Sequence, residues 1–495
     1  MVKLNIKHLG EKFTFKADSM LLEFLTKSKS LKSEVSKLCE KWEIEIPKVL
    51  LTDFLDEKSS ELKSFSSSKP ESFVIAKVDL EKNFSADFFR NYIAGFVKGI
   101  KLDTISNLYI KVPDYENFQS YFHSEEYYYQ SFIEGLYLGT YSFDVYKSEK
   151  DKPKSVNVFL ISQSKEKTVK AISKGTSISE SVYFTRDLIN EPAITLTPVE
   201  LANRTKKELT KYGVKVTVYN KKELEKRNMH AILAVGNASD NPPCLIEMNY
   251  KPRGAKKKIL LVGKGLTYDA GGLSIKPTEG MIDMNVDMAG AGTVIGTLLA
   301  AAKLKLKVEI IGLVPAAENM ISGNSYKPGD IINSYSGKSI EVKNTDAEGR
   351  IVLADALAYG MKKKPDTTID LATLTGACVV ALGEYAAGLF TKDDKLAAEL
   401  GGSGYETHER VWRLPMWDEY AELIKSDLAD VANLGSKWGG AITAAKFLEN
   451  FVEKDTSWAH IDIAGPSCKN KLNNYTKDFH PGFGVRLLVN YLENK

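Results

Sequence analysis

The sequence predicts an α/β protein with two domains. The larger, C-terminal domain is expected to hold a mixed, largely parallel sheet flanked by helices, and the smaller N-terminal domain is also expected to be α/β. Three observations support this: the length of 495 residues exceeds one typical core, short apolar strands alternate with helical patterns in the second part, and the first part has a different composition, rich in Lys, Glu, Ser, Phe and Tyr. The predicted boundary separates residues 1–172 from 173–495, with residues 173–192 as a connecting helix.

The N-terminal part contains patterns of both strands and helices. Residues 72–78 and 156–161 read as strands, whereas helical patterns surround Leu21–Leu25 and Ser85–Val97. Tyrosines and phenylalanines gather between residues 121 and 129, and we expect a helix that packs them into its own core rather than a stacking surface. This part carries no chemical motif.

The C-terminal part begins with the connecting helix and continues as alternating strands and helices. The helical pattern is strongest from Ser177 to Asn190 and ends before Pro192, after which Thr197 and Pro198 fit the cap and first position of the next helix. Strands are expected at residues 214–219, 244–250, 258–262, 308–314, 367–371, 386–390 and 460–463. Helices are expected at residues 288–304, 351–363, 443–453 and 484–493, and a flexible loop at residues 401–404.

The composition limits the classes of function. A net charge of +3, from 67 basic and 64 acidic residues, creates no electrostatic need for nucleic acid. Four scattered cysteines without a CxxC pair indicate free thiols in a reducing compartment. The N-terminus lacks the apolar run of a signal peptide, and the apolar stretch at residues 289–302 is too short to cross a bilayer. We therefore expect a cytoplasmic protein without a membrane partner.

The run NTDAEGR at residues 344–350 is the most informative segment. In an extended backbone, side chains two residues apart point to the same side, so Asp346, Glu348 and Arg350 are expected to converge on one point. None of the six histidines pairs with another at a helical metal spacing, so carboxylates must hold any bound metal.

A second cluster of charged residues lies upstream, among glycines and apolar residues. Its members are Lys264, Asp269, Lys276, Asp283 and Asp287. Several of them follow predicted strand ends, where open α/β sheets bind their ligands. Acids packed in this way fit a cage for two divalent cations better than a solvated surface. Lys264 alone would indicate a salt bridge, because a lysine that binds metal must be a neutral amine.

Two cations in such a cage would favour hydrolysis. Water shared between them loses a proton near neutral pH and becomes a nucleophile. Lys276 and Arg350 remain as cations that could polarise a carbonyl and hold an anion. These residues are suited to the addition of hydroxide to an amide or ester.

These segments resemble the leucyl aminopeptidase family, or cytosol aminopeptidases, which are dinuclear metallo-exopeptidases. The resemblance covers about residues 180 to 495 and is carried by NTDAEGR, GKGLTYDAGGLSIKP, VDMAGAG, LATLTGA and HIDIAGP, in the family's order. It implies a metalloprotease, a hydrolase that releases N-terminal amino acids from peptides, with leucine-like residues preferred. It also implies two Zn²⁺ or Mn²⁺ ions per subunit, a bound bicarbonate and a homo-hexamer.

The resemblance also implies a role for each matching residue. The expected metal ligands are Lys264, Asp269, Asp287, Asp346 and Glu348. Asp269 and Glu348 would bridge the two ions. Lys276 is expected to polarise the scissile carbonyl, and Arg350 to hold the bicarbonate that acts as a general base. The pocket for the first substrate side chain is expected at Met284, Thr373, Gly376 and Ala464.

Three features stand apart from these roles. Ala270 replaces the family's usual serine, and we expect altered hydrogen bonding rather than lost activity. Asp283 has no expected role beyond a solvated loop charge. The glycines of residues 290–296 do not fit the dinucleotide fingerprint, and close helix packing explains them.

Two other functions stay open at this point. A dinuclear phosphoesterase would also use a carboxylate cage, although such sites are usually rich in histidine. A DNA-binding regulatory role, a secondary activity known in the family, would use residues 251–258, where five of eight residues are basic. A solvated loop is the simpler explanation, so nucleic acid is not expected as a partner.

Overall fold

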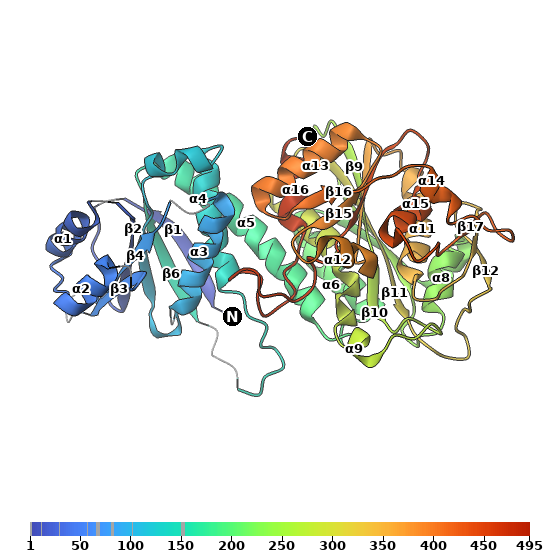
Figure 1. Cartoon of the computed structure of the whole chain (residues 1–495), viewed down its shortest axis with the longest axis horizontal. Coiled ribbons are helices and arrows are strands. Elements are labelled where there is room, and N and C mark those ends of the chain that lie inside the picture. The colour runs from blue at the N-terminus through green and yellow to red at the C-terminus, as the bar shows by residue number, and fades with distance from the viewer. Residues whose placement is uncertain are drawn as a thin grey trace. The chain divides into compact units, whose positions relative to one another are not determined.

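The chain forms two compact units in the computed structural model (Figure 1), which describes residues 2–10, 12–28, 30–56, 58–65, 70–80, 84–100, 102–149 and 154–495. One unit comprises Met1–Ser179 with Asn473–Tyr475, and the other comprises Glu180–Leu472 with Thr476–Lys495. The division falls within one long helix, α5 (Lys165–Asn190). This helix begins well before Ser177, because the preceding residues contain no proline and Gly175 packs closely against Ile133 without ending the helix.

The N-terminal unit is a sheet with helices on both faces, in the strand order β1-β6-β5-β2-β4-β3. Neighbouring strands are parallel except β3 and β4. The strands are β1 (Lys3–Leu9), β2 (Ser19–Thr26), β3 (Glu61–Phe65), β4 (Ser72–Val78), β5 (Asn107–Lys111) and β6 (Ser155–Ile161). Helices α1 (Leu31–Trp42) and α2 (Lys48–Leu55) cover one face, and α3 (Ala86–Gly99) and α4 (Glu125–Gly139) cover the other.

Most of the elements predicted for this unit are confirmed. The strands at β4 and β6 match, and α3 begins after Ser85, whose side chain accepts a hydrogen bond from the Phe88 N–H. Helix α4 buries Tyr127, Tyr128 and Tyr129 in the core as expected, whereas Tyr121 of the predicted cluster is exposed and lies in a 3₁₀ turn before this helix.

The predicted helix around Leu21–Leu25 is wrong, because these residues belong to strand β2. The strand lies between β5 and β4, and Leu21 and Leu22 are both fully buried. A parallel strand covered on both faces carries a continuous apolar run without alternation. Such a run fits a buried strand and a helix equally well, so periodicity alone misled the prediction.

The second unit contains a larger, mixed sheet in the order β16-β15-β18-β14-β9-β11-β8-β7, with β10 paired to β11. Strands β18, β14, β9, β11 and β10 run parallel, which confirms the predicted α/β class with a largely parallel sheet. The strands are β7 (Lys215–Tyr219), β8 (Cys244–Tyr250), β9 (Lys258–Gly263), β10 (Gly265–Asp269), β11 (Glu309–Asn319), β14 (Thr367–Ala372), β15 (Ala387–Phe390), β16 (Val411–Arg413) and β18 (Ser457–Asp462). A small sheet joins β12 (Ile331–Asn333), β13 (Ser339–Glu341) and β17 (Val431–Ala432).

Helices cover both faces of the larger sheet. One apolar core includes α6 (Pro198–Leu209), α10 (Ala289–Leu304), α13 (Asp394–Thr407) and α16 (Val485–Glu493). The other includes α7 (Lys221–Lys226), α8 (His230–Gly236), α11 (Glu348–Met361) and α15 (Gly440–Glu449). Ile259 and Leu261 of β9 belong to the first core, and Leu260 and Val262 to the second. The central strand is therefore apolar on both sides, as a buried parallel strand requires. The short helices α9 (Thr278–Met281), α12 (Gly376–Leu382) and α14 (Glu419–Glu422) connect these layers.

The predicted elements of this unit match with shifted ends, and one prediction is wrong. Residues 401–404 lie inside α13 rather than in a loop, since the buried Leu396 and Leu400 fix this helix in the core and Gly404 lies close to the backbone of Glu409. The close packing predicted for the glycines of α10 is confirmed, because a side chain at Gly296 would collide with Thr185 of α5. Residues 251–258 connect β8 to β9 and are mostly exposed, as expected of a solvated loop.

One apolar helical run needs separate mention. Thr278–Leu304 is long and apolar enough to cross a membrane, unlike the shorter stretch considered from sequence, because the helical turns before Ala289 extend it. Within the protein, 89% of its apolar window is buried. The segment is therefore a core element of the second unit.

Candidate metal centre

The candidate ligands come together at the carboxyl edge of the parallel strands in the second unit. Lys264 directly follows β9, Asp269 ends β10, and Asp287 lies in a 3₁₀ turn (Met284–Met288) before α10. Asp346 lies in a turn, and Glu348 is the first residue of α11. Parallel α/β sheets bind their ligands at this edge.

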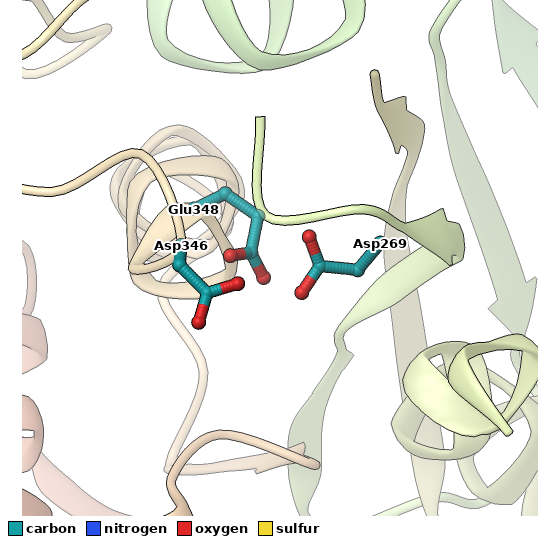
Figure 2. Close-up of side chains that lie close together, drawn as sticks. All are labelled: Asp269, Asp346 and Glu348. Carbon is teal, nitrogen blue, oxygen red and sulfur yellow. The ribbon is translucent and has the colours of Figure 1, made fainter. Parts of the chain in front are cut away.

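The NTDAEGR segment is not extended, so that part of the prediction is wrong. Asp346 and Glu348 still converge with Asp269, since one oxygen from each lies within 4.8 Å of the others. Figure 2 shows Glu348, at the start of α11, and Asp346, from the turn before it, close to Asp269 of β10. Arg350 points elsewhere, and its Nη1 donates to the Asn433 carbonyl at 2.8 Å. Side chains two residues apart on a helix are rotated by about 200° around its axis, so Glu348 and Arg350 cannot point in the same direction.

One half of the centre is fully buried around Lys264. Its Nζ lies 2.8 Å from Asp287 Oδ1, 2.8 Å from Glu348 Oε1 and 3.0 Å from the Thr373 carbonyl. The exposed fractions of Lys264, Asp287 and Glu348 are only 3%, 4% and 1%. Gly349 makes this possible, because a β-carbon there would lie 2.7 Å from the Lys264 Nζ, 2.8 Å from its Cδ and closer still to its Cε.

The other half is more accessible and is organised around Lys276. Its Nζ lies 2.8 Å from Asp269 Oδ2 and also contacts Asp346 Oδ1. The side chains of Lys276 and Asp346 are 16% and 34% exposed. Asp269 itself is fixed from behind, since its Oδ1 accepts hydrogen bonds from the Gly271 N–H at 2.9 Å and from Asn319 Nδ2 at 2.8 Å. This half is therefore the side from which a substrate could approach.

Burial raises the pKa values of three of these acids. Burial and the neighbouring Asp269 raise the pKa of Asp346 and of Glu348, and burial with repulsion from Asp269 and Glu348 raises the pKa of Asp287 well above its usual range. Burial alone would lower the pKa of Lys264, but Asp287, Glu348 and Asp269 together raise it. Burial would also lower the pKa of Lys276, but the negative charges of Asp269 and Glu348 raise it above its usual value.

The donor set fits divalent cations. In the described chain, four carboxylates share two lysine ammonium groups here, so the fully ionised cluster carries two more negative than positive charges. Among the described residues, Asp287 Oδ2 and Glu348 Oε2 are buried without a hydrogen-bond partner. Buried carboxylate oxygens without donors are costly unless a cation binds them, and hard divalent ions prefer such oxygens.

Arg350 is a buried cation in the first turn of α11, two residues after Glu348. It is 4% exposed, and burial lowers the pKa of its guanidinium to about 10. Its Nε has no hydrogen-bond partner in the part of the chain that the structure describes. The guanidinium therefore retains a donor that an anion could use.

The four residues expected to form the substrate pocket lie around the ends of β14 and β18. Thr373 Oγ1 donates to Asp287 Oδ1 at 2.9 Å, and half-buried Met284 belongs to the same turn as Asp287. Gly376 is exposed at the start of α12. The Ala464 N–H donates to Asp462 at 3.1 Å, as does the N–H of Leu374. Their role in binding a side chain stays a prediction.

Ala270 and Asp283 take no part in the ion-pair network. The backbone N–H of Ala270 donates to the Asn319 carbonyl at 3.0 Å, and its carbonyl accepts from the Lys276 N–H at 3.0 Å. The methyl side chain adds no hydrogen bond to this arrangement. Asp283 forms an exposed ion pair with Lys469 at 2.7 Å.

Sequence reasoning missed two residues that hold the centre together. Asn319 Nδ2 donates to Asp269 Oδ1 at 2.8 Å and to the Thr345 carbonyl at 3.0 Å. The hydroxyl of Thr345 donates to the Gly271 carbonyl at 2.7 Å. Asn319 ends strand β11, so a search for polar residues at strand ends would have found it.

Comparisons with known proteins identify the family of this chain. The sequence profile described as the cytosol aminopeptidase family, catalytic domain, matches residues 183–489. The chain belongs to this family. It is therefore a metal-dependent aminopeptidase, a hydrolase, and the resemblance seen in the sequence is confirmed. Membership of this family leaves the phosphoesterase alternative without support.

Several relatives of this family are closely similar along most of the chain. A probable cytosol aminopeptidase of Chloroherpeton thalassium is 47% identical over 388 residues, which cover 75% of this chain and 76% of the relative. One from Aquifex aeolicus is 44% identical over 410 residues, with coverages of 82% and 81%. The structure of the bottromycin maturation enzyme BotP in complex with Mn has a TM-score of 0.84 and 29% identity, and covers 97% of this chain and 99% of its own.

Proposed function

We propose that the aminopeptidase reaction takes place at this centre, on two divalent ions held by Lys264, Asp269, Asp287, Asp346 and Glu348. The observation that carries the proposal is the excess of buried carboxylates over ammonium groups, with Asp287 Oδ2 and Glu348 Oε2 left without donors among the described residues. Asp269, Asp287, Glu348 and Lys264, the last as a neutral amine once its proton is lost, would hold the buried ion. Asp269, Asp346 and Glu348 would hold the accessible one.

When bound, the two ions supply Lewis acidity and lower the pKa of a water molecule between them. The remaining residues act on the substrate. Lys276 is the half-buried cation of the accessible side, so it would polarise the scissile carbonyl. Arg350, with its unpartnered Nε among the described residues, would hold a bicarbonate as the proton-transferring base.

The substrate class follows from the residues around Asp287. Met284 and Ala464 are apolar, Gly376 leaves space above the start of α12, and the Thr373 hydroxyl fixes the Asp287 carboxylate. This supports peptides as substrates, with a leucine-like first residue preferred. The free α-amine of the peptide would be recognised near Asp287, which restricts cleavage to the first peptide bond.

Metal identity, assembly and location are also proposals. Zn²⁺ or Mn²⁺ would occupy the sites, and the complex of BotP with Mn supports Mn²⁺. Large exposed side chains on the second unit, such as Trp412, Trp417 and Trp438, support burial in a homo-hexamer, which light scattering would test. The name shared by the relatives, cytosol aminopeptidase, supports a cytoplasmic location.

The test is a metal titration followed by two parallel assays. Metal-free protein should bind two equivalents of Mn²⁺ or Zn²⁺ per chain and gain activity on an aminoacyl anilide in step with the second equivalent. An aryl phosphate serves as the control substrate and should not be hydrolysed. Full activity with a single equivalent would contradict the dinuclear assignment, and hydrolysis of the phosphate ester would reopen the alternative function.

A further inference from the structure

The N-terminal unit has a cleft of its own at the carboxyl edge of its parallel strands. The cleft has a volume of about 250 Å³ and lies beside the ends of β2 and β5. Strand β2 continues into α1 on one face of the sheet, and β5 leads to α4 on the other face. A crevice between neighbouring strands whose helices leave to opposite faces is where open α/β sheets bind ligands.

A buried carboxylate forms the floor of this cleft. Glu23 lies inside strand β2 and is only 1% exposed. Trp42 Nε1 donates to Glu23 Oε1 at 2.7 Å, whereas Oε2 forms a long ion pair of 3.9 Å with Lys111 Nζ. That separation is too long for a hydrogen bond. Burial raises the pKa of Glu23, and a positively charged group placed at Oε2 would relieve this cost.

Two lysines also line the cleft. Lys111 stands directly across from Glu23 in the β2–β5 register, and its side chain is 41% exposed. Lys37, on the exposed side of α1, also lines the cleft. The two lysines lie on different elements, so the space between them can receive an anionic group.

The same surroundings disfavour a phosphate ligand. Glu34 lies in the first turn of α1 and accepts hydrogen bonds from the Ser28 and Ser30 hydroxyls, so it places negative charge where a helix would otherwise attract an anion. The sequence between β2 and α1 contains no glycine to form a phosphate-binding turn. Asp114, on the other rim, adds a further negative charge. A ligand that carries an ammonium group fits these acids better than a phosphate does.

We propose that this cleft binds a small zwitterion of the free amino acid class. Its ammonium group would meet Glu23 Oε2, and its carboxylate would lie between Lys111 and Lys37. A volume of 250 Å³ is below the range of about 300–1,000 Å³ typical of drug-sized ligands, which suits one amino acid. The site lies in the unit that does not contain the metal centre, so it goes beyond the proposed function. An aminopeptidase releases compounds of this class, so the ligand would be chemically related to its products.

The test measures binding of L-leucine to the full-length Glu348→Ala protein, in which the metal centre is impaired. Calorimetry and the fluorescence of Trp42, which contacts Glu23, should both report saturable binding. Adding Glu23→Gln, which keeps an oxygen for the Trp42 N–H, should weaken the affinity at least about tenfold, and so should Lys111→Met. Glu61→Gln, on the edge strand β3, is the matched control and should bind as the parent does.

Two analogues of the ligand sharpen the result. Leucinamide lacks the carboxylate and N-acetyl-leucine lacks the ammonium group, so both should bind at least about tenfold more weakly than leucine. Equal binding of either analogue, or equal affinity in the Glu23→Gln protein with an unchanged melting temperature, would overturn the proposal. Absence of a Trp42 response to leucine would do the same. None of these outcomes bears on anilide hydrolysis by the unmodified enzyme, which tests the metal centre separately.

Discussion

Arg90 and Lys264 are both buried cations surrounded by carboxylates, yet their clusters differ in how completely they are satisfied. In the N-terminal unit, the Arg90 guanidinium is 0% exposed and lies 2.8 Å from Glu134 and 3.1 Å from Asp87. Its Nη2 also donates to the hydroxyls of Tyr127 and Ser131. Tyr475 donates to Asp87, and Gln130 donates to Glu134 at 2.7 Å. Each carboxylate of this cluster therefore has several donors.

The metal centre has too few donors for its acids. Four carboxylates share two lysines there, and two of the buried oxygens have no partner among the described residues. The contrast separates two uses of buried charge. A cluster whose carboxylates all have donors supports the fold, whereas buried carboxylate oxygens without donors suit the binding of added cations.

Substitution of Glu348 gives the strongest test of whether the two clusters differ in function. Glu348→Ala removes the carboxylate that both halves of the centre share, so we expect activity per folded molecule to fall by more than about 100-fold, beyond the effect of an outer hydrogen-bond partner. The fold should persist, because Lys264 still has Asp287 as a partner. Anilide hydrolysis and a melting curve measure the two effects. A variant with near-normal activity would show that the cluster is structural after all.

The Arg90 cluster should respond in the opposite way. Arg90→Met leaves Glu134 and Asp87 buried without their cation, and we expect a loss of about 3–5 kcal/mol in the free energy of unfolding. Activity per folded molecule should stay the same. Lys170→Met is the control, since its ion pair with Glu166 is exposed to solvent and should change the free energy of unfolding far less. Denaturant unfolding measures both changes. An equal loss of stability in the two variants would contradict the structural role of Arg90.

A finer test concerns the support behind the ligands. Asn319→Ala removes the amide that links Asp269 to the Thr345 carbonyl, so we expect the affinity for Mn²⁺ or Zn²⁺ to fall by about 10- to 100-fold. Competition with a fluorescent chelator measures this affinity. Asn324→Ala, at an exposed turn, should leave it unchanged. Activity of the Asn319 variant should return at high metal concentration, and a loss that metal cannot restore would point to misfolding instead.

The smallest expected effect concerns His480, which belongs to neither cluster and makes the stability of the fold depend on pH. Burial lowers the pKa of His480 to about 4, and its Nδ1 donates to the Ser467 carbonyl at 2.9 Å. Because the folded pKa lies below the unfolded value, the stability due to neutral His480 is present above about pH 6.5 and is lost as the pH falls towards 4. His480→Gln should reduce the loss of stability between pH 7 and pH 5 by about 1–2 kcal/mol. An equal loss of unfolding free energy between pH 7 and pH 5 in the two proteins would refute this.

The sequence predicted the strands that carry the site better than it predicted the path of the chain between them. Cys244–Tyr250 and Lys258–Gly263 are short apolar runs with clear ends, so their strands match the prediction closely. Leu21–Leu25 has the same character, but nothing local shows that β4 and β5 cover both of its edges. Local patterns report the burial of a segment and not the neighbours that bury it.

The chemistry of the site was predictable because it depends on residue types at fixed spacing. Asp346 and Glu348 meet Asp269 as expected, although they do so from a turn and a helix start rather than an extended strand. Arg350 and Asn319 show the limit. The direction of Arg350 depends on where α11 begins, and the contacts of Asn319 depend on the pairing of β10 with β11. Both are properties of the folded chain.

Two glycines near the centre have a consequence for any survey of tolerated mutations. A β-carbon at Gly290 would collide with the Leu371 carbonyl, and one at Gly349 would collide with the aliphatic stem of Lys264. Neither position offers a group to a metal or a substrate, yet even alanine there would push the Lys264 side chain or the end of β14 out of place. A scan that replaces each residue in turn would therefore find inactive variants at positions with no side chain to lose. Inactivation there would reflect the steric cost of one added methyl group.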